Sequence, residues 1–155
     1  MQPSLRAARA EDARRIADLL IETRFKFMPY APSAHPEHSV REWVASHLIP
    51  TGGVVVAEFD SQVVGTMATA VKDKMFWITQ MAVDPSMIGR GIGSALLVHA
   101  TKTFARPIRL YTFQQNTGAR RFYERHGFQA VQFTQGEDNE ERCPDVLYEL
   151  ALPEA

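Results

Sequence analysis

The fold follows from one stretch of sequence, Val83-Asp84-Pro85-Ser86-Met87-Ile88-Gly89-Arg90-Gly91-Ile92-Gly93-Ser94-Ala95-Leu96-Leu97. It predicts a strand that ends in a turn, three glycines at alternate positions, and then a helix with periodic apolar residues. Glycine lets the backbone approach a ligand closely, and the first N–H groups of a helix are unpaired at the positive end of its dipole. The stretch therefore predicts a phosphate-binding turn between a strand and a helix.

Two common phosphate loops do not fit this spacing. A P-loop requires a glycine, four intervening residues and then Gly-Lys-Ser/Thr, and no lysine follows the glycines here. A dinucleotide fingerprint requires a glycine three places after Gly93, where Leu96 stands, and an acidic residue about 20 positions further on. That region reads Leu110-Tyr111-Thr112-Phe113 and contains no carboxylate. Both nucleotide-binding interpretations are therefore disfavoured.

A second informative segment runs from Asn116 to Phe128 and predicts a capped helix. Asn116 is a favoured N-cap residue, and Gly127 stands where a left-handed C-cap residue belongs. Ala119, Phe122 and Tyr123 recur at spacings of three and four residues, so they are expected on one side of this helix.

Together the two segments resemble the acyl-CoA loop and the following Asn…Phe-Tyr…Gly-Phe helix of the GNAT superfamily of acyl-CoA-dependent N-acyltransferases. The resemblance covers roughly 76–128, and the flanking elements fit the order of the family. It implies an α/β fold with a mixed, mostly antiparallel central sheet and helices on both faces. The close alternation of strands and helices predicts a single domain over 1–155.

The resemblance also implies how acetyl-CoA is bound. Backbone N–H groups of the loop would hold the pyrophosphate, and the preceding strand would pair with the pantetheine arm. A backbone N–H near Met81 or Ala82 would polarise the thioester carbonyl. Asn116 matches a position that often hydrogen-bonds the cofactor arm. The implied acetyl-CoA contacts are Met81, Ala82, Val83, Ile88, Gly89, Arg90, Gly91, Ile92, Gly93, Ser94, Asn116, Ala119, Phe122 and Tyr123.

Tyr123 matches the residue that gives a proton to the departing thiolate in this family, and it is the predicted catalytic residue. A phenol has a reference pKa near 10, close to that of an alkyl thiol, so the proton could pass without a large energetic cost. The alternative role for Tyr123 is that of a core aromatic residue beside Phe122.

One position departs from the family pattern. The usual motif has Gln or Arg where this chain has Ile88, and an isoleucine side chain cannot replace those hydrogen bonds. Backbone groups supply most phosphate contacts in such a loop, so we expect weakened binding of CoA and not its loss.

The general base and the acceptor amine are less defined. The strand 76–80 carries no carboxylate, and the candidate bases are His35, His38, Glu140, Glu141, Asp145 or a water held by Gln80. By resemblance, the acceptor enters opposite the cofactor, between 27–31 and 139–142. The predicted acceptor contacts are Phe27, Tyr30, Gln80, Glu140 and Glu141. Aromatic rings beside carboxylates suit a small cationic amine, although a polar turn without a ligand is an equal alternative.

Composition narrows the class of protein. The chain has 155 residues, 45% of them hydrophobic, and a net charge of −1, which disfavours disorder and a nucleic-acid partner. No apolar run is long enough to span a membrane, and the N-terminus lacks a signal sequence. A single cysteine, Cys143, excludes an internal disulfide. A cytoplasmic protein without a bound metal is expected, and a homodimer is plausible by resemblance alone.

The rest of the chain predicts further elements. Strands are expected over 5–8, 54–59, 62–71, 75–83, 108–113, 128–134 and 146–151, and helices over 11–28, 39–49 and 116–126. Ser39 is the expected N-cap of the second helix, with Glu42 at the capping-box position. The segment 136–142 is expected to be a solvated hairpin connection.

Two functions from different classes fit the sequence. The first is an N-acetyltransferase that moves an acetyl group from acetyl-CoA to a primary amine by direct attack in a ternary complex. A small-molecule acceptor is favoured, and the sequence does not separate it from a peptide N-terminus or a lysine side chain. The second is a non-catalytic acyl-CoA-binding sensor or regulatory module. Tyr123 and Asn116 favour the enzyme, whereas Ile88 keeps the second interpretation open.

Overall fold

The computed structural model describes residues 2–153 and contains one seven-stranded sheet in the order β1-β2-β3-β4-β5-β7-β6. The strands are β1 (Ser4–Ala7), β2 (Val54–Phe59), β3 (Gln62–Lys72), β4 (Met75–Val83), β5 (Ile108–Phe113), β6 (Gln129–Phe133) and β7 (Asp145–Leu150). All neighbouring strands are antiparallel except β4 and β5, which are parallel. The mixed, mostly antiparallel sheet predicted from the sequence is therefore confirmed.

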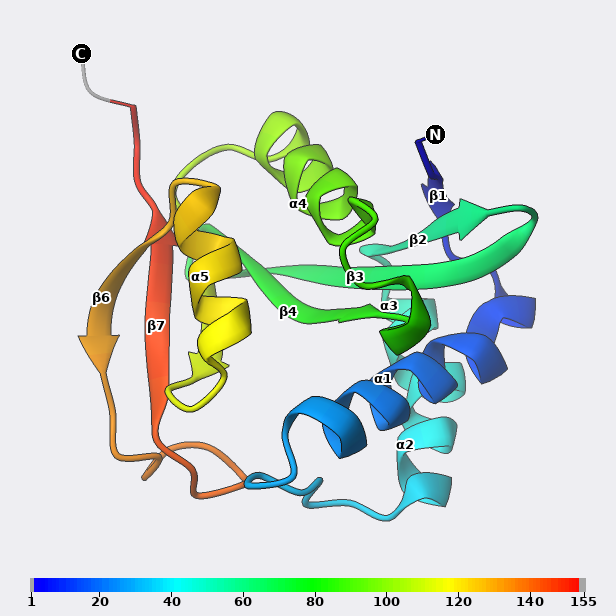
Figure 1. Ribbon diagram of the computed structural model, residues 1–155, viewed down its shortest axis with the longest axis horizontal. Coiled ribbons are helices and arrows are strands. Elements are labelled where there is room, and N and C mark those ends of the chain that lie inside the picture. The colour runs from blue at the N-terminus through cyan, green and yellow to red at the C-terminus, as the bar shows by residue number, and fades with distance from the viewer. Residues whose placement is uncertain (1, 154–155) are drawn as a thin grey trace.

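Helices cover both faces of this sheet. They are η1 (Ala10–Asp12), α1 (Ala13–Phe27), α2 (Glu37–Trp43), the π-helical turn η2 (Val44–Leu48), α3 (Ile49–Thr51), η3 (Pro85–Met87), α4 (Ile92–Thr103) and α5 (Thr117–Arg125). Figure 1 shows α1 and α2 next to each other, away from α4 and α5. No helix in the described part of the chain is both long and apolar enough to cross a membrane.

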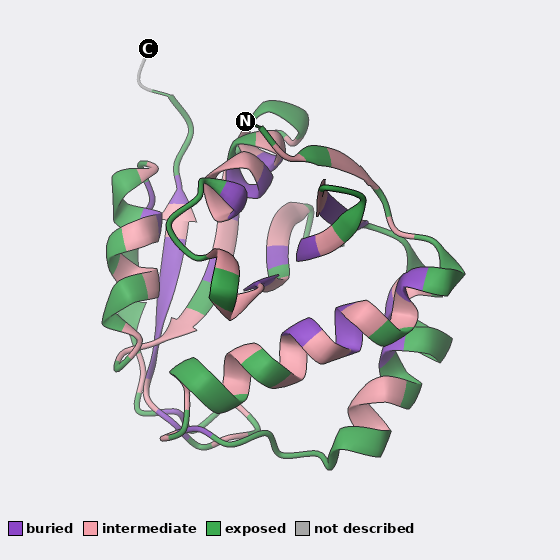
Figure 2. Cartoon of the chain, turned by 45° about the vertical axis from the view of Figure 1, so that its right-hand side comes forward, coloured by how far each residue is buried: buried purple, intermediate pink, exposed green. Residues whose placement is uncertain are grey.

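Two apolar cores hold these layers together. One core packs α4 and α5 on the sheet through residues such as Leu96, Leu97 and Tyr123. The other packs α1 and η2 on β2 and β3 through residues such as Ile16 and Val44. Figure 2 shows the burial of β7, which is purple over nearly its whole length up to the C-terminal end.

The sheet opens at its centre, between β4 and β5. Pairing between these strands is limited to Phe76 with Ile108 and Trp77 with Arg109. On the other side, β4 and β3 change register beyond Ala68, which leaves Thr79 as an extra residue in β4. Such a bulge bends and twists a strand, so the end of β4 leaves β5 and its edge there has no strand partner.

One predicted helix start is wrong. The helix begins at Glu37, two residues before the predicted N-cap Ser39. Pro36 is extended, with φ −66° and ψ 159°, and its carbonyl accepts hydrogen bonds from the N–H groups of Ser39 (3.0 Å) and Val40 (3.1 Å). Ser39 therefore lies inside the first turn, where the backbone of Pro36 already serves as the N-cap.

Candidate active site

A cavity of about 890 Å³ lies where β4 and β5 separate, bordered by the glycine loop, the C-terminal end of α1, α5 and the β6–β7 loop. It brings together most residues that the sequence predicted for the site. Those in its lining are Phe27, Gln80, Met81, Ala82, Val83, Ile88, Gly89, Gly91, Ile92, Gly93, Ser94, Asn116, Ala119, Phe122, Tyr123 and Glu141. Arg90, Tyr30 and Glu140 do not line it.

The glycine loop has the geometry of an open cradle. Gly89 and Gly91 have φ of 84° and 81°, a region that glycine adopts without strain, and a Cβ at either position would meet open space. Gly91 is the N-cap of α4, which gives the cavity the unpaired N–H groups of a helix start. Ile88 is 55% exposed and offers no polar group to a ligand. The loop thus fits a phosphate through its backbone.

A polar turn fixes the strand end from which this loop starts. The Asp84 carboxylate accepts hydrogen bonds from the Ser86 N–H (2.9 Å) and hydroxyl (2.8 Å). The Arg15 guanidinium of α1 contacts it at 2.6 Å. Burial disfavours the charged carboxylate, but the Ser86 hydrogen bonds and Arg15 outweigh this effect and lower the pKa of Asp84. The turn therefore ties α1 to the start of the loop.

Tyr123 connects α5 to the open edge of β4. Its ring is buried against Phe122, Phe128 and Tyr148, with centroid distances of 5.3, 6.0 and 6.2 Å. Its hydroxyl donates to the Sδ of Met81 at 3.9 Å, a weak acceptor. Burial raises the pKa of Tyr123 to about 12, so the phenol is a weaker acid than its reference value suggests.

Asn116 caps α5 as predicted. Its Oδ1 accepts a hydrogen bond from the Ala119 N–H at 3.2 Å. The capping bond uses the oxygen of the amide, so the amide Nδ2 keeps its donors at the wall of the cavity.

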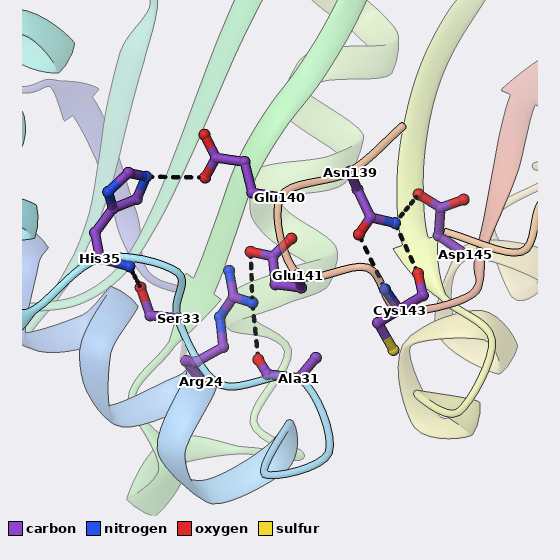
Figure 3. Close-up of polar contacts among 9 residues, drawn as sticks. All are labelled: Arg24, Ala31, Ser33, His35, Asn139, Glu140, Glu141, Cys143 and Asp145. Carbon is purple, nitrogen blue, oxygen red and sulfur yellow. Dashed lines mark hydrogen bonds and ion pairs between the residues drawn. The ribbon is translucent and has the colours of Figure 1, made fainter. Parts of the chain in front are cut away.

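Charged residues close the opposite end of the cavity, and Figure 3 shows their contacts. The Nη1 of Arg24, in the last turn of α1, donates to Oε2 of Glu141 and to the Ala31 carbonyl, each at 3.0 Å. The Arg24 Cζ lies 5.6 Å from the centroid of the Phe113 ring, a cation–π distance. The Glu141 side chain is 13% exposed. Thus α1 and the β6–β7 loop meet through a partly buried ion pair.

Comparison with known proteins identifies the family. Residues 13–128 match the model of the acetyltransferase (GNAT) family. The chain belongs to this family. A search of curated proteins finds no match at the significance required.

Solved structures share the GNAT fold over nearly the full length of the chain. The apo form of YjaB from Escherichia coli is 22% identical, with a TM-score of 0.76 over 97% of this chain and 98% of YjaB. Naa50 from Arabidopsis thaliana in complex with the bisubstrate analogue CoA-Ac-MVNAL is 20% identical, with a TM-score of 0.72 over 98% and 100%. The PaiA N-acetyltransferase from Thermoplasma acidophilum in complex with coenzyme A is 18% identical, with a TM-score of 0.73 over 98% and 100%.

Two predicted acceptor contacts lie outside the cavity of this GNAT protein. Glu140 is 66% exposed and pairs with His35 at 2.9 Å, over a separate shallow hollow. Tyr30 packs edge-on against Phe113 with a centroid distance of 6.1 Å, so it supports the cavity wall from behind. Its buried hydroxyl has no hydrogen-bond partner within residues 2–153, and burial raises its pKa.

The segment 136–142 joins β6 to β7 as an exposed turn, as predicted, and contacts at its two ends hold it in place. Asn139 donates to the Cys143 carbonyl at 2.7 Å and accepts from the Cys143 N–H at 3.1 Å. Gly136 is buried with φ 84°, and a Cβ there would lie 2.5 Å from the Cys143 backbone. These contacts fix the loop that carries Glu141.

Sequence reasoning missed Arg24 and Phe113 as residues of the site. Arg24 is one cation in the last turn of an amphipathic helix, and its partner Glu141 lies 117 positions further on. Phe113 ends an ordinary apolar strand, so its position beside the cavity depends on the separation of β4 from β5. No local pattern could have indicated either position.

The structure divides the six proposed general bases into three groups. Gln80, Glu141 and Asp145 line the cavity, and His35 and Glu140 lie over the separate hollow. His38 is exposed in α2 and lines neither. Asp145 is buried and accepts hydrogen bonds from the Thr134 hydroxyl and, at 3.1 Å, from Asn139. Within residues 2–153, no group of three or more His, Cys, Asp and Glu side chains is arranged to hold a metal ion.

Proposed function

We propose that this GNAT protein transfers an acetyl group from acetyl-CoA to a primary amine of a small molecule, by direct attack in a ternary complex. One observation carries the proposal. A single cavity joins the glycine loop, the edge of β4 that β5 leaves open, Tyr123 and a polar acceptor end. A donor and an acceptor could therefore meet at the thioester without leaving the protein.

The residues support a division of roles along this cavity. The open loop around Gly89 and Gly91 would hold the phosphates of acetyl-CoA through backbone N–H groups. The end of β4 pairs with β3 but has no strand on its edge toward β5, so the backbone on that edge is free to pair with the extended arm of the cofactor. An N–H at Met81 or Ala82 would then donate to the thioester oxygen as negative charge develops on it.

Tyr123 is proposed to act on the departing sulfur. Its hydroxyl lies at the boundary between α5 and β4 and already donates to the sulfur of Met81. As the amine attacks the carbonyl carbon and the C–S bond breaks, the sulfur gains negative charge and becomes a stronger acceptor. The Tyr123 hydroxyl would stabilise it by hydrogen bonding.

The proposal is tested first by calorimetric titration of acetyl-CoA and of free CoA, followed by thiol-release assays with a panel of primary amines. Micromolar binding together with amine-dependent thiol release is the expected result. Binding without turnover on any amine would favour the acyl-CoA-binding sensor, for which the high pKa of Tyr123 is the structural argument. No binding up to about 1 mM would overturn both functions. Cytoplasmic location, a homodimer and a single domain over 1–155 stay predictions from the sequence.

A further inference from the structure

The proposed transfer leaves one proton without an acceptor. As the amine nitrogen bonds to the carbonyl carbon, the nitrogen becomes positively charged and must lose a proton. The Tyr123 hydroxyl is a donor on the sulfur side, so it does not take this proton. Strand β4 carries no acidic or basic side chain over 76–80. The group that accepts the proton must therefore come from another element that borders the cavity.

Two carboxylates line the cavity, Glu141 of the β6–β7 loop and Asp145 at the start of β7. The candidate histidines lie elsewhere, His35 over the separate hollow and His38 exposed in α2. Gln80 lines the cavity, but an amide does not take up a proton at neutral pH. The choice among the proposed bases is therefore between the two carboxylates.

Asp145 already holds the loop in place. Its Oδ1 accepts a hydrogen bond from the Thr134 hydroxyl, and its Oδ2 accepts one from the Asn139 Nδ2 at 3.1 Å. The residue is 7% exposed. A proton on either oxygen would displace one of these hydrogen bonds in a buried place, at a cost of about 1–3 kcal/mol. Asp145 is therefore a structural carboxylate.

Glu141 has one oxygen without a protein partner. Its Oε2 accepts from the Nη1 of Arg24 at 3.0 Å, and its Oε1 accepts no hydrogen bond within residues 2–153. Solvent reaches Oε1, because the buried side-chain atoms without a partner in this part of the chain are the Tyr30 hydroxyl and the Trp77 Nε1. A carboxylate oxygen that water reaches can take a proton from an amine and release it to solvent after each turnover.

Arg24 fixes the direction of this carboxylate, as Figure 3 shows. Its guanidinium is itself held by the Ala31 carbonyl at 3.0 Å and lies over the Phe113 ring. Arg24 belongs to α1 and Phe113 ends β5, so two regular elements beside the cavity hold the Glu141 side chain. A base that a third group orients is a common arrangement in catalytic sites.

We propose that Glu141 is the general base of the transfer and that Arg24 is its positioning residue. The Oε1 of Glu141 takes a proton from the acceptor nitrogen, directly or through one water, as the C–N bond forms. The electron pair of the C–S bond leaves with the sulfur, which the Tyr123 hydroxyl stabilises, and the proton passes from Glu141 to solvent. Acetyl-CoA and the amine thus give the amide, the CoA thiolate and one proton. This inference rests on the proposed function and names the base that it needs.

The first test is Glu141→Gln in the thiol-release assay, with n-butylamine as the first probe and then the rest of the primary amine panel. Glutamine keeps the size of the side chain and an oxygen for Arg24, but it cannot accept the proton. We expect kcat on any amine that the unmodified protein acetylates to fall about 10²-fold. The KM of that amine and the calorimetric Kd of acetyl-CoA should each stay within about threefold.

The positioning role of Arg24 is tested by two substitutions. Arg24→Gln removes the charge that holds Oε2 of Glu141, so kcat should fall about tenfold because the base is misplaced. Arg24→Lys should recover most of this loss, because an ammonium group can also hold a carboxylate oxygen. A residue needed only for packing would lower stability and would not give this recovery of kcat.

Asp138→Asn is the matched control for Glu141→Gln. It removes one negative charge from the same loop, but Asp138 is exposed over the separate hollow and does not line the cavity. Turnover should stay within about threefold of that of the unmodified protein. If Glu141→Gln does not fold, Glu141→Asp takes its place. It keeps the charge for Arg24 and draws the carboxylate back by one methylene, so kcat should fall about tenfold or more.

Two results would overturn the assignment of the base while the proposed function stands. One is a kcat of Glu141→Gln, or of Glu141→Asp in its place, within about threefold of that of the unmodified protein. The other is a loss confined to the KM of the amine, which would make Glu141 a residue that only binds the acceptor. If the unmodified protein releases no thiol with any amine of the panel, the proposed function fails and the assignment of the base fails with it.

Discussion

Replacing Tyr123 with phenylalanine separates a catalytic role from a packing role. The change removes one hydroxyl whose contact within residues 2–153 is the Met81 sulfur at 3.9 Å, a weak acceptor. The ring keeps its packing against Phe122, Phe128 and Tyr148. We therefore expect the free energy of unfolding at neutral pH to change by less than about 1 kcal/mol. Turnover should fall by about 10²-fold, or about 3 kcal/mol of transition-state stabilisation.

The raised pKa of Tyr123 adds an independent measurement at alkaline pH. The group titrates near its usual value of 10.0 in the unfolded chain and at about 12 in the folded protein. Below pH 10 both states hold the proton, and the stabilising effect of the neutral buried phenol is fully present. As the pH rises toward 12 the unfolded state loses its proton first, so stability falls. The loss is about 1 kcal/mol at about pH 11 and approaches about 3 kcal/mol above pH 12.

Both effects are measured on the same pair of proteins. Thiol release at saturating acetyl-CoA gives turnover, and urea unfolding from about pH 8 to pH 11 gives the free energy of unfolding. The Tyr123→Phe variant should not show the decrease in the free energy of unfolding that ionisation of Tyr123 causes at alkaline pH. Tyr30 and Tyr148 also have a raised pKa, and the decrease that they cause is the same in both proteins. Turnover within about threefold of the unmodified protein would refute the catalytic role. If the free energy of unfolding falls with pH equally in the two proteins, burial does not raise the pKa of Tyr123.

Four other predictions test the packing and the loops. Tyr148→Phe removes hydrogen bonds to Glu124 (2.6 Å) and from Arg120 (3.1 Å), so urea unfolding should show a loss of about 2 kcal/mol. Ile88→Arg should tighten acetyl-CoA binding about tenfold in calorimetry, and a change below about twofold would contradict the expected loss of side-chain contacts. Gly136→Ala should destabilise the protein by about 2 kcal/mol or more, because the added Cβ would clash with the Cys143 backbone and position 136 has a positive φ. Gly118→Ala should not destabilise it, because a Cβ at position 118 meets no atom within 4 Å. Cys143 should react with iodoacetamide far more slowly in the folded than in the unfolded protein at pH 8. Burial, and then the neighbouring carboxylates, raise its pKa; equal rates would show an accessible thiolate.

The features that local sequence could predict are those fixed by backbone geometry. Gly89 and Gly91 form the turn predicted between β4 and α4, and Asn116 and Gly127 cap α5 as their residue types predicted. Each of these features depends on a few adjacent residues. Ser39 shows the limit of such signals, because a nearby proline supplied a competing helix start.

The features that sequence could not predict arise between distant segments. The opening between β4 and β5 depends on a change in register against β3, which no single strand encodes. The pairing of Arg24 with Glu141 depends on where α1 ends relative to the β6–β7 loop. Glu140 and Glu141 are neighbours of identical type, yet only the fold places one in the cavity and the other over the exposed hollow.

The pKa of Tyr123 changes how its chemistry should be understood. Against an alkyl thiol of pKa near 10, complete transfer of a proton from a phenol of pKa about 12 is uphill by about two units, or about 3 kcal/mol. A hydrogen bond to the departing sulfur avoids this cost, because the phenol keeps its proton. The burial that weakens the acid also lowers the local dielectric and so strengthens a hydrogen bond to a charged acceptor. The hydroxyl would then exchange the weak thioether of Met81 for a thiolate, and it stays protonated at every pH at which the protein is expected to work.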